Sequence, residues 1–109
     1  MADILAYLGI SYTFVVNTWY HIAIVRNGGK ISAYINGVLV GSVDKATTYE
    51  FSMLPTMIGH SLDTNTDLSG FAGYIDEFRI SKVARWTADF TPPTAAYGYD
   101  ANTVVLLHF

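Results

Sequence analysis

The sequence predicts an all-β protein built as an antiparallel β-sandwich. The clearest signal lies in residues 19–43, where three runs of alternating apolar and polar residues are separated by short turns at residues 27–29 and at Asn36-Gly37. Asn-Gly readily adopts the positive φ angles of a type I′ turn, which joins neighbouring antiparallel strands. Three such strands in succession form a meander, and a second layer must cover its apolar face.

The first half of the chain predicts four strands. Residues 11–16 (SYTFVV) are typical of a strand, and residues 17–18 are typical of the turn after it. The next strand is expected at residues 19–26. Its two faces are both apolar, so we expect it at the centre of a sheet. The meander then continues with strands at residues 30–35 and 38–43.

The second half predicts shorter elements around one polar loop. Strands are expected at residues 56–59, 71–81 and 104–109, and the polar loop at residues 61–70 (SLDTNTDLSG). Residues 82–90 are expected to form one short helical turn, which a pair of prolines ends.

Composition limits the classes of function. The 109 residues are expected to form one domain, 1–109, because half of them are hydrophobic and only 14% are charged. A net charge of −3 without a basic stripe argues against nucleic-acid binding. Disulfides and thiolate sites are excluded, since the chain has no cysteine. No apolar run reaches the roughly 18 residues of a membrane helix, so we expect no membrane insertion.

Three blocks of sequence resemble the laminin G-like domains of the concanavalin A-like lectin/glucanase superfamily. The meander is similar to that family's W-Y-H strand followed by a Y-hydrophobic-N-G strand. The block MIGH, the polar loop and FAGYIDEFRISKVARW resemble its closing strand and the short helix after it. The final block, DFTPPTAAYGYDANTVVLLHF, resembles tails of phage and marine microbial multi-domain proteins. The resemblance covers residues 18–109 and implies a concanavalin A-like jelly roll.

The chain is shorter than such domains at its front. They carry several strands ahead of the W-Y-H strand, where only residues 1–18 stand here. The sandwich is therefore expected to be minimal or truncated, and three explanations remain open: a compact minimal fold, a fragment of a longer chain, or a subunit whose sheets another chain completes. Since a truncated sandwich exposes strand edges and apolar side chains, we expect a homo-oligomer or a strand-completing partner chain.

A candidate metal site lies in the polar loop. Asp63, Asn65 and Asp67 alternate along the chain, and oxygen ligands at such spacing can converge on Ca²⁺. An EF-hand is excluded, because Leu68 replaces the required glycine and Tyr74 the bidentate glutamate. Pentraxin-like relatives place calcium ligands in the corresponding loop, at the position of Asp63. The alternative is a solvated turn that binds no metal.

Ligand contact is expected at the rim of the sandwich. Of the loop residues, we expect His60, Asp63, Asn65 and Asp67 to reach a ligand first. His21 lies in the W-Y-H strand, where the resemblance implies a packed and hydrogen-bonded side chain.

The sequence argues against an enzyme. A retaining glucanase needs two carboxylates about 5 to 5.5 Å apart. The nearest pair is Asp76 and Glu77, which we expect to point to opposite faces of one strand. We expect Asp76 to make a structural hydrogen bond or to pair with Arg79 or Arg85.

These observations predict a non-catalytic recognition or assembly module, binding a glycan or a protein at the sandwich rim. The alternative is a structural virion component, such as a capsid decoration, fibre or tail protein, whose exposed strand edges join subunits. Either function implies an extracellular or virion-associated location, although the acidic start of the chain is unlike a signal peptide.

Overall fold

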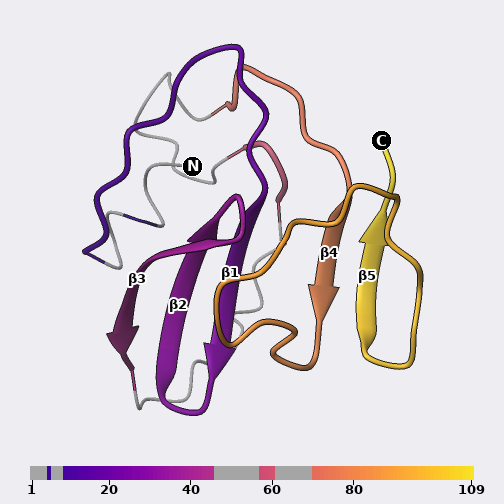
Figure 1. Ribbon diagram of the computed structural model, residues 1–109. Coiled ribbons are helices and arrows are strands. Elements are labelled where there is room, and N and C mark those ends of the chain that lie inside the picture. Colours follow the sequence, from indigo (N-terminus) through magenta and orange to yellow (C-terminus); the bar gives the residue numbers. More distant parts are fainter. Residues whose placement is uncertain (1–4, 6–8, 46–56, 61–69) are drawn as a thin grey trace.

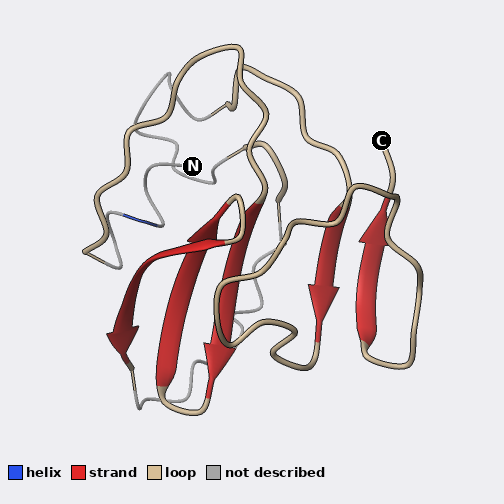
Figure 2. Ribbon diagram, in the orientation of Figure 1, coloured by secondary structure: helices blue, strands red, loops and turns tan. Residues whose placement is uncertain are grey.

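The computed structural model describes residue 5 and residues 9–45, 57–60 and 70–109. It confirms the predicted all-β class: the regular elements are antiparallel strands joined by loops (Figures 1 and 2). The strands described are β1 (Ile22–Asn27), β2 (Lys30–Ile35), β3 (Val38–Asp44), β4 (Phe78–Ser81) and β5 (Thr103–Leu107).

The meander forms a three-stranded sheet in the order β1-β2-β3. The predicted turn at Asn36-Gly37 is confirmed, since both residues have positive φ, 51° and 80°, as a type I′ turn requires. The turn between β1 and β2 is of a different type. Only Gly28 has positive φ there, at 60°, which is the pattern of a type II′ turn.

The prediction that the strand at 19–26 is central was wrong. Within the sheet β2 is central, with β1 and β3 on either side. Among the described residues β1 pairs with β2 alone. Its Ala23 and Val25 side chains are buried on one face, whereas Ile24 on the other face is 40% exposed. β1 begins at Ile22, which leaves Trp19 outside the ladder and 67% exposed.

Two small hydrophobic clusters lie on opposite faces of this sheet. Ala33 packs in one cluster with Leu5 and Ile10. The next residue, Tyr34, packs in the other cluster with Ala23 and Val25 and is covered by residues 84–90. Successive residues of a strand point to opposite faces, so the three-stranded sheet is covered on both.

β4 and β5 form a second, two-stranded antiparallel sheet. In Figure 1 β4 is drawn next to β1, on the side away from β2, but no ladder joins these two strands among the described residues. The link between them is made by side chains. The Trp86 ring lies 5.5 Å from the His21 ring beside β1, and the Arg79 guanidinium of β4 lies 5.6 Å from the same indole.

Several predicted elements are shorter or missing. Residues 11–15 join no ladder; instead the rings of Tyr12, Phe14 and Tyr20 pack against one another. The strand predicted at 71–81 is reduced to β4, because Glu77 adopts a left-handed φ of 51° that interrupts an extended chain.

The described part of residues 56–59 also forms no strand. The helical turn predicted at 82–90 was wrong, since these residues form bends after the end of β4. Phe90 donates its N–H to the Gly37 carbonyl at 2.9 Å, and its ring stacks on Trp86 at 4.1 Å. These contacts hold residues 86–90 against the sheet in a non-helical conformation.

Replacing Gly37 tests the contact between the second hairpin and residues 84–90. A Cβ atom there would lie 1.8 Å from the Phe90 carbonyl oxygen, at a φ of 80°. We expect Gly37→Ala to lower the free energy of unfolding by about 2 kcal/mol or more in urea titrations.

Gly28→Ala is the matched control for that variant. It has positive φ as well, but nothing lies within 4 Å of the added Cβ. Its expected cost is about 1 kcal/mol, from backbone strain alone. Equal losses in the two variants would show that the contact with Phe90 contributes nothing.

Candidate functional site

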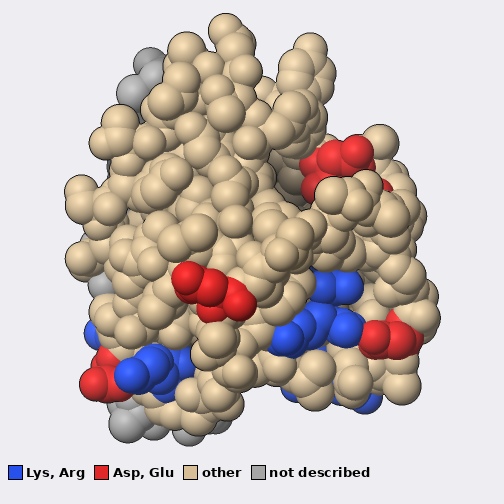
Figure 3. Space-filling model, viewed as in Figure 1, with Lys and Arg blue, Asp and Glu red and all other residues tan. Residues whose placement is uncertain are grey.

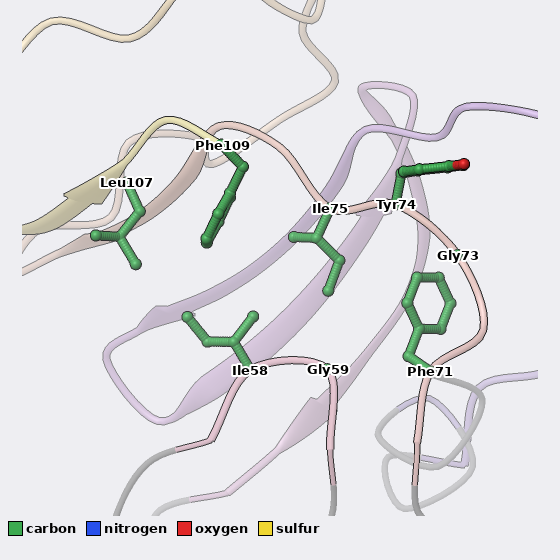
Figure 4. A pocket seen from close by; sticks show the side chains of 8 residues that line it. All are labelled: Ile58, Gly59, Phe71, Gly73, Tyr74, Ile75, Leu107 and Phe109. Atoms are coloured by element: carbon green, nitrogen blue, oxygen red, sulfur yellow. The ribbon is translucent and has the colours of Figure 1, made fainter.

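A pocket of about 480 Å³ opens between residues 58–59, residues 71–75 and the end of β5. Figure 4 shows the side chains of Ile58, Ile75 and Phe109 approaching one another, while the hydroxyl of Tyr74 points away from them. The full lining is Ile58, Gly59, Phe71, Gly73, Tyr74, Ile75, Leu107 and Phe109. The pocket therefore offers a ligand mainly hydrocarbon surface with some polar atoms, and none of the lining side chains is charged.

The rings of this pocket are open to solvent. Tyr74 is 86% exposed, Phe109 69% and Phe71 46%. On the face drawn in Figure 3, acidic and basic side chains form small separate groups, and most of the surface is uncharged. A contiguous exposed apolar surface is typical of a binding site.

Backbone contacts bring the two sides of the pocket together. His60 and Gly70 form an isolated antiparallel bridge, and the Phe71 N–H donates to the Gly59 carbonyl at 2.8 Å. Gly59 has a φ of 78°, which a residue with a side chain rarely adopts. His60 and Gly70 therefore pair with each other beside the pocket.

The predicted ligand residues divide into two groups. His60 is described, and it lies next to the pocket residue Gly59 with its side chain exposed. Asp63, Asn65 and Asp67 lie outside the described residues, so the calcium site stays a prediction. Within the described ranges, no three His, Asp or Glu side chains come together as metal ligands.

Two carboxylates hold the chain after β5 against the pocket. Asp76 accepts a hydrogen bond from the Phe109 N–H at 3.1 Å and another from the Glu77 N–H at 2.8 Å. One oxygen of Glu77 lies 2.6 Å from Nδ1 of His108, and the other accepts from the Tyr97 N–H at 2.8 Å.

The prediction that these carboxylates point to opposite faces of a strand was wrong, because both residues precede β4 and both side chains bond to residues 108–109. The expected structural hydrogen bond of Asp76 is confirmed. Its alternative pairing with Arg85 is not made, since Arg85 binds Asp100 through two hydrogen bonds of 2.8 and 2.9 Å.

Hydrogen bonding lowers the pKa of both carboxyl groups. The Phe109 and Glu77 N–H groups lower the pKa of Asp76, and the Tyr97 N–H and the His108 side chain lower that of Glu77. A glycosidase acid needs the opposite shift, a raised pKa that keeps its proton at neutral pH. The lowered pKa values of Asp76 and Glu77 fit carboxylates that hold residues 108–109 in place, and they do not fit a catalytic acid.

His21 is packed and hydrogen-bonded, as the resemblance implied. Its Nε2 lies 2.6 Å from the Tyr97 hydroxyl, and its backbone N–H donates to the side chain of Asn36 at 2.9 Å. Burial and then the charge of Arg79 lower the pKa of His21, so the neutral form is favoured. The side chain ties β1 to the segment that precedes β5.

The family comparison matches the part of the chain that contains these contacts. The family model described as the concanavalin A-like lectin/glucanases superfamily, of laminin G type, matches residues 5–89. The chain belongs to this superfamily. Neither a curated protein nor a solved structure matches it.

Membership in the concanavalin A-like superfamily agrees with the observed antiparallel sheets and with the architecture of a small sandwich. Laminin G-like domains are generally non-catalytic binding modules. The matched range includes Ile58, Phe71 and Ile75 of the pocket, whereas β5 and Phe109 lie beyond it. As for membranes, the described residues contain no helix long and apolar enough to span one.

Sequence reasoning missed the pocket in this superfamily member. Phe71, Tyr74 and Ile75 all fall within the strand predicted at residues 71–81, and that prediction gives no pocket. The available signal was the glycine spacing: Gly70 and Gly73 flank Phe71, and glycine is disfavoured inside strands.

The two carboxylates predict a specific response to acid. Because their folded pKa values lie below the ordinary 3.8 and 4.5, they stabilise the fold fully above those values, and the stabilisation is lost as pH falls through the lowered pKa values. We expect the urea midpoint to fall as pH drops from about 4.5 to about 3.

The comparison variant for this acid response is Glu77→Gln, which keeps a side-chain oxygen but removes the titrating group. Its urea midpoint should depend less on pH over the same range. The groups that face this carboxyl are Asp76, His108 and the Tyr97 N–H, and none is changed. Identical slopes for wild type and variant would contradict the assignment.

Proposed function

We propose that the chain is a non-catalytic assembly module whose pocket binds apolar side chains of a second copy of the chain. The observation that carries the proposal is the pocket itself. It is open and lined mainly by hydrocarbon groups from residues 58–59, residues 71–75, Leu107 and Phe109. Burying aromatic rings of this kind against a partner is a main source of binding free energy at protein interfaces.

The pocket chemistry favours a protein over a sugar. Sugar hydroxyls need hydrogen-bonding groups beside a stacking ring. The one side-chain oxygen in the lining belongs to Tyr74, and it points away from the converging side chains (Figure 4). Aliphatic or aromatic side chains require no such partners.

The same chain exposes apolar side chains that could fill the pocket of another copy. Val15 is 62% exposed, Val16 84% and Trp19 67%, all on the segment that leads into β1. None of the three lines the pocket. A projection and a recess on one chain support head-to-tail contacts, which build rings or filaments.

Such assembly fits a structural virion component, either a capsid decoration, a fibre or a tail protein, in a virion-associated or extracellular setting. That context is supported by the exposed aromatic residues and by the resemblance of residues 89–109 to the C-terminal segments of phage proteins. Assembly could also occur through a strand-completing partner chain, because the sheet of β4 and β5 has two strands in the described part of the chain.

Sedimentation velocity tests self-association. We expect wild-type protein to form oligomers at micromolar concentration, and Phe109→Ser and Trp19→Ser each to weaken association about tenfold or more, as for central interface residues. Val83→Ser is the control, because Val83 is 45% exposed and does not line the pocket. A wild-type protein that stays monomeric would refute the proposal.

The second candidate is glycan binding at the rim by His60, Asp63, Asn65 and Asp67, with Ca²⁺ held by the last three. It is favoured by one observation: His60 pairs with Gly70 in a backbone bridge, next to the exposed rings of Phe71 and Tyr74.

Calcium titration distinguishes the two candidates. If the rim binds Ca²⁺, millimolar calcium should raise the melting temperature, and Asp63→Ala should abolish the rise. Asp44→Ala, an acidic residue at the end of β3, is the matched control. Under the assembly proposal we expect no shift with calcium and no binding on a glycan array.

A further inference from the structure

The chain beyond β5 forms one wall of the pocket, although little buries it. β5 ends at Leu107, and His108 and Phe109 continue past the ladder. Phe109 is 69% exposed, so packing alone leaves it free to move away. An exposed ring can shape a pocket only if its backbone is held in place.

One carboxylate accepts a hydrogen bond from this backbone, and the next one pairs with the His108 side chain. Asp76 accepts from the Phe109 N–H at 3.1 Å, and Glu77 lies 2.6 Å from the His108 ring nitrogen. Both carboxylates directly follow Ile75, whose side chain lies on the other side of the pocket (Figure 4). They therefore connect two walls of the pocket that lie more than 30 residues apart in sequence.

The backbone of this pair is itself under strain. Glu77 has a φ of 51°, a left-handed conformation that costs a residue with a side chain about 1 kcal/mol. Its own N–H donates to Asp76 at 2.8 Å, and its second carboxylate oxygen accepts from Tyr97. The surrounding bonds thus fix an unfavourable conformation that directs the side chain to His108, and such strain is often found at functional sites.

We propose that Asp76 and Glu77 are positioning residues that set the shape of the binding pocket by fixing His108 and Phe109. The inference rests on the proposed function for its biological meaning, but its physical content is separate: the order of Phe109 depends on two carboxylates. Neither residue lines the pocket, so neither is expected to touch the partner.

The experiment measures the order of Phe109 and self-association in the same set of variants. In ¹⁵N-labelled protein, Asp76→Ala should speed amide exchange of Phe109 about tenfold or more and lower its heteronuclear NOE. Asp76→Asn keeps a side-chain oxygen that can accept the Phe109 N–H, and it should stay close to wild type. Glu77→Ala and Glu77→Gln form the corresponding pair for His108.

Sedimentation then shows whether this order matters for binding. Both alanine variants should associate more weakly than wild type, while Asp76→Asn and Glu77→Gln should not. Unchanged exchange at Phe109 in Asp76→Ala would overturn the inference, and so would normal association by a variant with a disordered Phe109. A monomeric wild type would instead refute the proposed function, and the exchange measurement would still test the positioning.

Discussion

Side chains connect the two sheets of this protein, with Trp86 between them and a hydrogen bond from His21 to Tyr97 beside it. No ladder joins β1 to β4 in the described part of the chain, so side chains must transmit position from one sheet to the other. Trp86 stacks on Phe90, contacts His21 beside β1 and lies under Arg79 of β4. β4 starts directly after residues 71–77, so the contact of Trp86 with Arg79 lies on the strand that follows the pocket segment.

Local signals predicted the meander well and the second half poorly. The strand at 30–35 and the Asn36-Gly37 turn formed as expected, since a hairpin with a two-residue turn is specified by neighbouring residues. The segments 71–77 and 82–90 are shaped by contacts with residues far away in sequence. Examples are the hydrogen bond from the Phe109 N–H to Asp76 and that from the Phe90 N–H to the Gly37 carbonyl. Alternation of apolar residues carries no information about those contacts.

The predicted rim site stays a prediction. His60 lies next to the pocket residue Gly59, whereas Asp63, Asn65 and Asp67 lie outside the described residues. The apolar lining was not predicted: an exposed Phe71 or Tyr74 has the same sequence pattern as a buried one. The family comparison places the chain in the concanavalin A-like superfamily, and a fold of this kind does not by itself specify a partner.

The position of Phe109 has a practical consequence for handling the protein. Because that residue forms a pocket wall, a label attached at its position would change the pocket itself. The β1–β2 hairpin tip is a better attachment point. It lies at the opposite end of the strands from the C-terminus in Figure 1, and around Gly28 the space is open.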